Sequence, residues 1–386
     1  MKKKFKKNDL IRFSNPYYTG NEKFYIDKVL ENATLSGDGE LTKLCNEELS
    51  RFLNVKNILL TNSCTAALEM AALLLDIQPQ DEVIMPSYTF VSTANAFVIR
   101  GGIPVFIDID KNTLNLDLDF IEKAITSKTK AIVAVHYGGI SCDMNRLCKI
   151  AKKYGITIIE DSAQALGGFY EDKPLGTIGS IGCFSFHATK NIISGEGGAI
   201  YVKDENLFRK AEIIREKGTN RTAFSQGFVD KYTWIDVGSS FLPSELMAGF
   251  LYPQLLEIKE ITNKRLKIWE KYKIALVELE KLNLIEIPQL PNYSKSNAHL
   301  FYILLKNEFV RNQFIAFMRS KNIITPFHYV PLHNSSFGAK VSKVSGDLFQ
   351  TDRIASTLVR LPLWPHMPDI FTERIIEEIK SFFNIS

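Results

Sequence analysis

The segment Cys183–Ile200, CFSFHATKNIISGEGGAI, places a lysine in a short loop between two apolar runs. The first run ends at Phe186, Lys190 follows in the loop, and the glycine-rich run 195–198 precedes the second apolar run. A lone loop lysine is most often a solvated side chain. A functional role for Lys190 therefore needs support from the rest of the chain.

Strand and helix patterns alternate on both sides of this segment. Several apolar runs are continuous, which is typical of strands covered on both faces in a parallel sheet. Strands are predicted at residues 56–63, 81–90, 103–109, 130–137, 155–163, 181–188 and 197–204, and helices at 65–75, 118–127 and 144–155. The repeated order predicts an open, largely parallel α/β sheet.

The pattern changes near residue 245. Residues 244–282 read as one long amphipathic helical segment, residues 299–307 and 324–330 as strands, and 371–383 as a closing helix. We therefore expect a large domain over residues 1–254 and a smaller C-terminal α+β domain over residues 255–386.

Composition excludes several classes of protein. A formal charge of +4 over 386 residues is too mild to indicate nucleic-acid binding, and the basic cluster MKKKFKK at residues 1–7 is expected to be a frayed tail. Five cysteines without paired spacing and six scattered histidines indicate neither a disulfide framework nor a metal site. With no apolar run of membrane-spanning length and no signal peptide, we expect a cytoplasmic protein with no membrane partner.

An acid stands where the strand at 155–163 ends. Ligands of open α/β sheets bind outside the carboxyl ends of the strands, and Asp161 and Lys190 both follow such ends. A buried acid needs a cation or hydrogen bonds to offset its desolvation. Asp161 as the N-cap of a following helix is the competing interpretation.

Other strand ends supply an anion site and aromatic rings. Residues 61–65, TNSCT, place hydroxyls and backbone N–H groups at a helix N-terminus, which suits a phosphate; ordinary capping by Ser63 or Thr65 is the alternative. Ser185 adds a hydroxyl or is a core serine. In PSYTF, Tyr88 and Phe90 either cover a flat ring or fill the core.

Together these groups match the needs of pyridoxal 5′-phosphate (PLP). This cofactor requires a lysine for covalent attachment, an acid at its pyridine nitrogen, an anion site for its phosphate and an aromatic neighbour for its ring. The sequence therefore predicts a PLP site in which Lys190 is the attachment point.

The chain also resembles the DegT/DnrJ/EryC1/StrS family of nucleotide-sugar aminotransferases, which are PLP enzymes of fold-type I. The resemblance extends from about Phe13 to the C-terminal helix. The most specific stretches are residues 62–97 and 175–200; LSGDGELTKLCNEEL, EDSAQALGG, EIIREKGTNR, NAHLFYI and FHYVPLH also match.

The resemblance implies roles for matching positions. Lys190 and Asp161 fall on the family's catalytic lysine and acid, and the remaining cofactor contacts fall on Gln164, Phe90, Cys64, Thr65 and Ser185. A family asparagine that reaches the partner subunit's phosphate lies in a G-x-N-x-R motif. Here Ser240 replaces that asparagine and Leu242 the arginine, which weakens the expectation of this contact between subunits.

The resemblance also implies partners. They are L-glutamate as amino donor, a dTDP-linked keto-sugar (dTDP-4-dehydro-6-deoxyglucose, aminated at C4) and a second copy of the chain in a homodimer with shared active sites. Such an aminosugar suits O-antigen, lipopolysaccharide or enterobacterial common antigen. Candidate sugar-nucleotide contacts are Gly37, Asp38, Lys217, Arg221, His328, Tyr329 and His333, each with a turn or surface role as the alternative.

Two other functions compete with the aminotransferase. GTIGSIG at residues 176–182 superficially suggests nicotinamide binding, but it has the wrong spacing and precedes a strand instead of opening a helix. A non-catalytic cofactor-binding regulator is the second alternative, although no DNA-binding appendage is visible. Sugar dehydratases related to this family carry histidine in place of the lysine, so Lys190 favours an aminotransferase.

Overall fold

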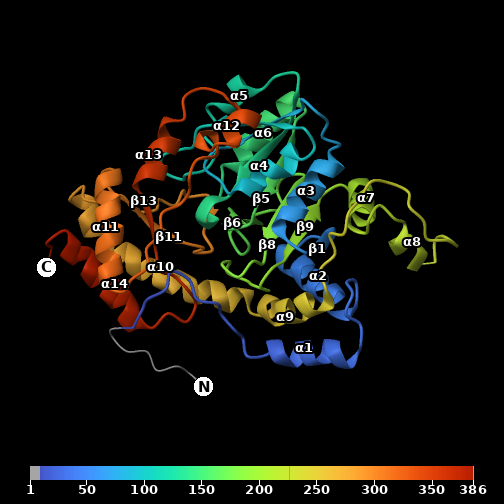
Figure 1. The fold of residues 1–386 in the computed structure, drawn as a ribbon, viewed down its shortest axis with the longest axis horizontal. Coiled ribbons are helices and arrows are strands. Elements are labelled where there is room, and N and C mark those ends of the chain that lie inside the picture. The colour runs from blue at the N-terminus through green and yellow to red at the C-terminus, as the bar shows by residue number, and fades with distance from the viewer. Residues whose placement is uncertain (1–8, 226, 386) are drawn as a thin grey trace.

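The structure is a computed structural model that describes residues 9–225 and 227–385. The basic cluster at residues 1–7 lies outside these described residues. Figure 1 shows a larger α/β part joined to a smaller C-terminal part by helices that run along one side of the molecule.

An eight-stranded sheet forms the centre of the larger part (Figure 1). In spatial order its strands are β1 (Ile58–Thr61), β9 (Gly198–Val202), β8 (Ile181–Ser185), β5 (Thr157–Asp161), β4 (Thr129–Val135), β2 (Glu82–Pro86), β3 (Ile103–Ile107) and β12 (Lys343–Val344). β9 is antiparallel to both of its neighbours, and the other pairs are parallel. The predicted mostly parallel α/β sheet is confirmed.

Side chains of the central strands alternate between two apolar layers, which explains their continuous apolar runs. In β4, Ala131, Val133 and Val135 join the core formed with α3, whereas Ile132 and Ala134 join the core formed with α6. The helices of this part are α1 (Glu22–Glu31), α2 (Glu40–Leu53), α3 (Cys64–Leu74), α4 (Val91–Val98), α5 (Ile121–Ala124), α6 (Met144–Tyr154), α7 (Glu205–Arg215), α8 (Arg221–Ser225) and α9 (Glu245–Leu256).

Shorter elements complete the larger part. A three-stranded sheet contains β6 (Phe169–Tyr170), β7 (Lys173–Pro174) and β10 (Ser294–Lys295), and a 3₁₀ turn, η1, spans Tyr137–Gly139. The predicted helix at residues 118–127 is reduced to the single turn α5.

The C-terminal part has a separate apolar core that includes Trp269, Phe301, Phe314 and Phe371. Ile11 belongs to this core and pairs with Ile323, so the segment around Ile11 packs with the C-terminal part. The elements here are α10 (Ile258–Lys281), α11 (Glu308–Ser320), η2 (Leu332–Asn334), α12 (Gly338–Val341), α13 (Phe349–Thr357), α14 (Asp369–Phe382), and the antiparallel pair β11 (Phe301–Leu304) and β13 (Leu358–Leu361). The division at residue 254/255 stays a prediction.

Two sequence predictions for the chain beyond residue 244 were wrong. The helical segment at 244–282 breaks at Glu257 into α9 and α10, because the Glu257 N–H bonds to Gln254 O in a tighter turn that follows Pro253. Residues 324–330 form no strand. Pro326 lacks an N–H for a ladder, and the His328 carbonyl accepts from the Tyr88 hydroxyl instead of from a neighbouring strand.

Candidate active site

A cavity of about 540 Å³ opens at the carboxyl ends of three adjacent strands. Val135, Asp161 and Ser185 end β4, β5 and β8 respectively, and all three line the cavity. This is the position at which open α/β sheets bind ligands. The predicted site residues that line the cavity are Lys190, Asp161, Gln164, Phe90, Cys64, Thr65, Ser185, His328 and Tyr329.

Lys190 lies in a compact loop between β8 and β9. Backbone hydrogen bonds join Phe186 N to Gly197 O and Ala188 N to Gly195 O, both at 2.8 Å. Gly195 adopts φ +83°, a left-handed conformation that favours glycine. The glycine-rich run therefore closes the loop tightly and holds Lys190 at the cavity.

Two consecutive acids on β5 face different environments. Asp161 lines the cavity, and its carboxylate accepts from Thr93 Oγ1 at 2.7 Å and from Ala163 N at 3.1 Å. Glu160 is fully buried and accepts from His136 Nε2 and from the N–H groups of Gly176, Ile178 and Gly179. The N-cap alternative for Asp161 is wrong, since turns and not a helix follow it.

The start of α3 forms one wall of the cavity. Ser63 caps this helix by accepting from Ala66 N at 3.0 Å, while Cys64 and Thr65 line the cavity beside it. Thr65 Oγ1 donates to Ser92 Oγ at 2.8 Å, which adds a second hydroxyl. The capping interpretation is therefore confirmed for Ser63, and the anion site at this N-terminus stays a prediction.

Aromatic side chains form another wall. Phe90 is 57% exposed and lines the cavity, with its ring centroid 6.5 Å from that of Tyr329. Tyr88 is fully buried, so the core interpretation holds for it. Gln164 accepts from Gly138 N at 2.7 Å and donates to the Tyr329 hydroxyl at 2.9 Å, which fixes Tyr329 against the cavity.

Burial sets the electrostatics of the site. Desolvation lowers the pKa of Lys190, and the like charge of Arg360 acts in the same direction. Desolvation also lowers the pKa of His299 and His328 well below the usual range and raises that of the Cys64 thiol. The cavity thus favours a neutral amine and neutral imidazoles.

Sequence reasoning missed several residues that the cavity contains. Arg265, His299 and Arg360 come from the C-terminal part, and Phe13 and Ser14 come from the N-terminal segment. Arg360 lies inside the apolar run LVRLPLW at residues 358–364. An isolated charge in such a run is either paired or functional, so the sequence alone could have indicated a role for Arg360. Arg265 lies in a lysine-rich helix and had no comparable signal.

Other predicted residues lie outside this cavity. Asp38 pairs with Arg215 at 2.7 Å, and the buried Glu216 pairs with Lys217 at 3.0 Å and Arg221 at 3.2 Å. Ser240 forms an isolated antiparallel β-bridge with Glu216 through the backbone. Gly37 lies close to Leu242 and Pro243. His333 Nδ1 is 2.7 Å from Ser87 Oγ.

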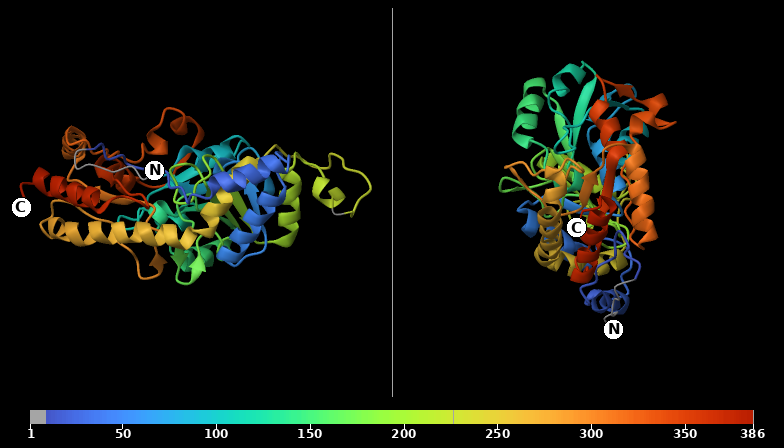
Figure 2. Two further views of the ribbon diagram at one scale, coloured as in Figure 1. Left: turned by 90° about the horizontal axis from the view of Figure 1, so that it is seen from below. Right: turned by 90° about the vertical axis from the view of Figure 1, so that its left-hand side faces the viewer.

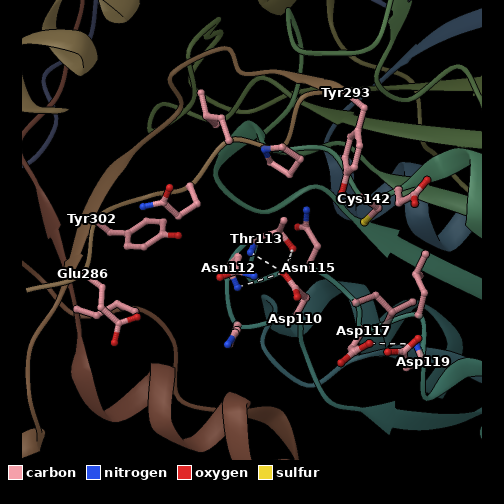
Figure 3. Close-up of a pocket in the computed structure, with 18 of the residues that line it drawn as sticks. Asp110, Asn112, Thr113, Asn115, Asp117, Asp119, Cys142, Glu286, Tyr293 and Tyr302 are labelled. Carbon is pink, nitrogen blue, oxygen red and sulfur yellow. Dashed lines mark hydrogen bonds between the residues drawn. The ribbon is translucent and has the colours of Figure 1, made fainter. Parts of the chain in front are cut away.

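A larger cavity of about 790 Å³ lies elsewhere, between the 110–119 loop and residues 280–304 (Figure 3). Asp110, Asp117, Asp119 and Glu286 surround it, but none of the predicted catalytic residues lines it. Within the described ranges, no cluster of His, Cys, Asp or Glu side chains could hold a metal ion.

The smaller cavity fits PLP by its donor set. It combines the Lys190 amine, the Asp161 carboxylate, a helix N-terminus with hydroxyls, and the exposed face of Phe90. A Cβ on Gly198 would lie 2.4 Å from the Ser63 carbonyl carbon, so glycine is needed for β9 to approach the start of α3 this closely.

Residues 16–380 match the DegT/DnrJ/EryC1/StrS aminotransferase family. The chain belongs to this family. It is 32% identical to the spore coat polysaccharide biosynthesis protein SpsC of Bacillus subtilis, over 97% of both chains.

Solved structures agree with this assignment. Spr1654 of Streptococcus pneumoniae in its PLP form superimposes with a TM-score of 0.89 at 26% identity, covering 97% of this chain and 99% of that one. Helicobacter pylori PseC, an aminotransferase involved in the biosynthesis of pseudoaminic acid, gives 0.87 at 26% identity over 97% and 100%. The protein is therefore a PLP-dependent aminotransferase of fold-type I, of the family that acts on nucleotide-linked keto-sugars.

Across the described residues, no helix combines the length and the apolar character that crossing a bilayer requires.

Proposed function

We propose that this aminotransferase moves an amino group from L-glutamate to C4 of dTDP-4-dehydro-6-deoxyglucose, giving dTDP-4-amino-4,6-dideoxygalactose. The observation that carries the proposal is the meeting of Lys190 and Asp161 in one cavity beside the start of α3. The sugar is suggested by the sequence resemblance of the runs 81–97 and 217–221. An aminosugar of this kind would serve a surface polysaccharide such as an O-antigen.

Lys190 is proposed to hold the cofactor covalently and then to move a proton as general base and acid. Its lowered pKa suits this role, because a neutral amine accepts protons. When bound, PLP supplies an electron-withdrawing ring that stabilises negative charge at the amino-acid carbon. Each turnover consists of two half-reactions, so we expect ping-pong kinetics.

Asp161 is proposed to keep the pyridine nitrogen protonated. The Thr93 hydroxyl and the Ala163 N–H both donate to its carboxylate, which fixes its orientation towards the cavity. Contacts to the rest of the cofactor are assigned by position, with Cys64, Thr65 and Ser185 at the phosphate, Phe90 on the ring face and Gln164 at the phenolic oxygen.

Sugar-nucleotide contacts fall into two groups. His328 and Tyr329 line the cavity and are placed to meet the sugar. Lys217 and Arg221 lie with Gly37, Asp38 and Ser240 on a separate surface. We propose that the two basic side chains, Lys217 and Arg221, meet the diphosphate in the active site of a partner subunit. His333 remains a proposed sugar-nucleotide contact, and its Nδ1 lies 2.7 Å from Ser87 Oγ.

A homodimer is proposed because the loop at residues 227–237, beyond α8, carries several exposed apolar side chains. Figures 1 and 2 show α8 and this loop projecting away from the sheet, and Phe228 and Trp234 are each 78% exposed. Such side chains are typical of a protein interface. A Trp234→Glu variant is expected to shift the protein towards monomer in analytical ultracentrifugation.

The deciding experiment incubates purified holoenzyme with glutamate and dTDP-4-dehydro-6-deoxyglucose and identifies the sugar by mass and NMR. A 4-amino-4,6-dideoxygalactose product supports the full proposal. The 4-aminoglucose epimer, or amination at another carbon, would keep the chemistry and change the sugar's binding pose. A bound cofactor whose spectrum does not respond to glutamate would favour the regulator instead.

A further inference from the structure

The larger cavity, of about 790 Å³, is separate from the active site. Among the described residues, none that lines it also lines the catalytic cavity. Its walls come from the 110–119 loop and the start of α6, and from residues 280–304 (Figure 3). Small-molecule sites typically measure about 300–1,000 Å³, so this cavity has the size for an organic ligand.

The lining of this cavity is acidic. Six carboxylates line it, against two cationic side chains, Lys111 and Arg146. Arg146 is already paired with one of the six, Asp119. The whole chain carries a formal charge of +4, so the negative charge is a local property of the cavity. The lining therefore favours a positively charged ligand.

Tyr302, on β11, directs its hydroxyl into the cavity (Figure 3). The residue is only 2% exposed, and its hydroxyl forms no hydrogen bond with any residue that the structure describes. Burial raises the pKa of this hydroxyl well above its usual range, and the carboxylates of Glu286 and Asp110 act in the same direction. Buried polar groups nearly always have a partner, so this neutral hydroxyl indicates a ligand that supplies one.

Asp117 is a second group in the cavity that lacks a counterpart. Its carboxylate accepts from Asp119 N at 3.0 Å, and within the described ranges no cation lies at ion-pair distance from it. Burial raises the pKa of Asp117, and the negative charges of Asp119 and Asp110 raise it further. A bound cation would offset both the desolvation and the repulsion between these acids.

We propose that this cavity binds a small organic dication, an α,ω-diamine, with one ammonium group at Tyr302 and the other at Asp117. Figure 3 places Tyr302 and Glu286 on one side of the cavity and Asp117 and Asp119 on the other. An ammonium N–H can donate to a carboxylate or to a phenolic oxygen, and the rings of Tyr302 and Tyr293 can add cation–π attraction. A neutral sugar would leave the acidic lining uncompensated.

The test measures binding by calorimetry on the holoenzyme. The probe is N,N,N′,N′-tetramethylhexane-1,6-diamine, a dication near neutral pH whose tertiary amines cannot form an imine with the cofactor. Asp117→Asn should weaken binding about tenfold and Tyr302→Phe about threefold, the effects of losing a charged and a neutral hydrogen bond. The matched controls are Asp27→Asn on the surface of α1 and Tyr18→Phe, whose ring is exposed; both should bind like wild type.

A neutral ligand of the same chain length, hexane-1,6-diol, isolates the contribution of charge. Saturable binding of the diamine that is weaker in both cavity variants and unchanged in both controls supports the site. The absence of binding to wild type, equal affinity for the diol, or unchanged affinity in either cavity variant would overturn it. Circular dichroism verifies folding, and if Tyr302→Phe does not fold, Asp117→Asn decides alone. Because binding is measured without turnover, failure of the proposed aminotransferase reaction leaves this result unaffected.

Discussion

The two cavities described above differ in how their charged groups are satisfied. In the larger one, Asp110 accepts from the N–H groups of Asn112 and Thr113 within its own turn, and Glu286 pairs with Arg353. In the smaller one, the amine of Lys190 and the guanidinium of Arg360 have no carboxylate in ion-pair contact among the described residues. Cavity volume alone therefore does not point to the active site; the buried cations beside a helix N-terminus support the smaller cavity as the candidate.

Replacing Lys190 is expected to have the largest effect on activity. Lys190→Ala is expected to lose more than about 1,000-fold in turnover, because both the attachment point and the proton-transfer group disappear. Turnover and the visible absorbance of bound cofactor measure the effect, with the exposed Lys203→Ala as control. A variant that kept both signals would remove Lys190 from the mechanism.

Removing the acid should have the next largest effect. Asp161→Ala is expected to bind cofactor weakly and to lose about 100-fold in kcat, equivalent to about 2.7 kcal/mol of barrier. Steady-state kinetics at saturating cofactor measure it, with Asp172→Ala on the exposed surface as control. Near-normal kcat would show that the ring nitrogen does not need this carboxylate.

The pKa of Lys190 provides another test of the difference between the two cavities. Burial disfavours the cation, so the folded apoenzyme should release this proton at a lower pH than the ordinary lysine value of 10.5. This pKa difference contributes stability that is fully present above the unfolded value and lost as pH falls through the lowered folded value.

The measurement is the rate of labelling by an amine-reactive reagent against pH, read by peptide mass spectrometry. Lys203 provides the internal comparison on the same chain. The Lys190 midpoint should lie below that of Lys203, and coincident midpoints would contradict the prediction.

The larger cavity should give the smallest effect. Glu286→Gln breaks a partly exposed ion pair with Arg353 and should change the free energy of unfolding by less than about 1 kcal/mol. Both kcat and KM should stay within about twofold, since the residue lies outside the catalytic cavity. A tenfold loss of activity with unchanged stability would make the larger cavity part of the function.

Local chemistry explains which parts of the site were predictable. Asp161 and Lys190 follow strand ends, so a parallel sheet was enough to bring them to one edge. The same rule could not predict Phe13, His299 or Arg360, which reach the cavity from the N-terminal segment and the C-terminal part. Their positions depend on how these segments pack against the sheet, which no local pattern describes.

Errors in the predicted elements have a related origin. Residues 324–330 are apolar enough for a strand. However, Pro326 has no N–H to donate to a neighbouring strand, and the His328 carbonyl accepts from the Tyr88 hydroxyl. These residues therefore form irregular chain beside the cavity. The break at Glu257 likewise follows a tighter hydrogen bond behind Pro253. In both cases a specific contact outweighs the periodic pattern.

The order of apolar runs, the glycine-rich loop and the acid at a strand end were enough to predict the parallel α/β sheet and PLP as the cofactor, with Lys190 as its proposed attachment point. These features are short-range, because each depends on residues close together in the chain. The arrangement of Arg265, His299 and Arg360 around Lys190 depended on the tertiary structure. These three residues follow Lys190 by 75 or more positions in the chain, and only the packing of the C-terminal part against the sheet edge brings them to the cavity.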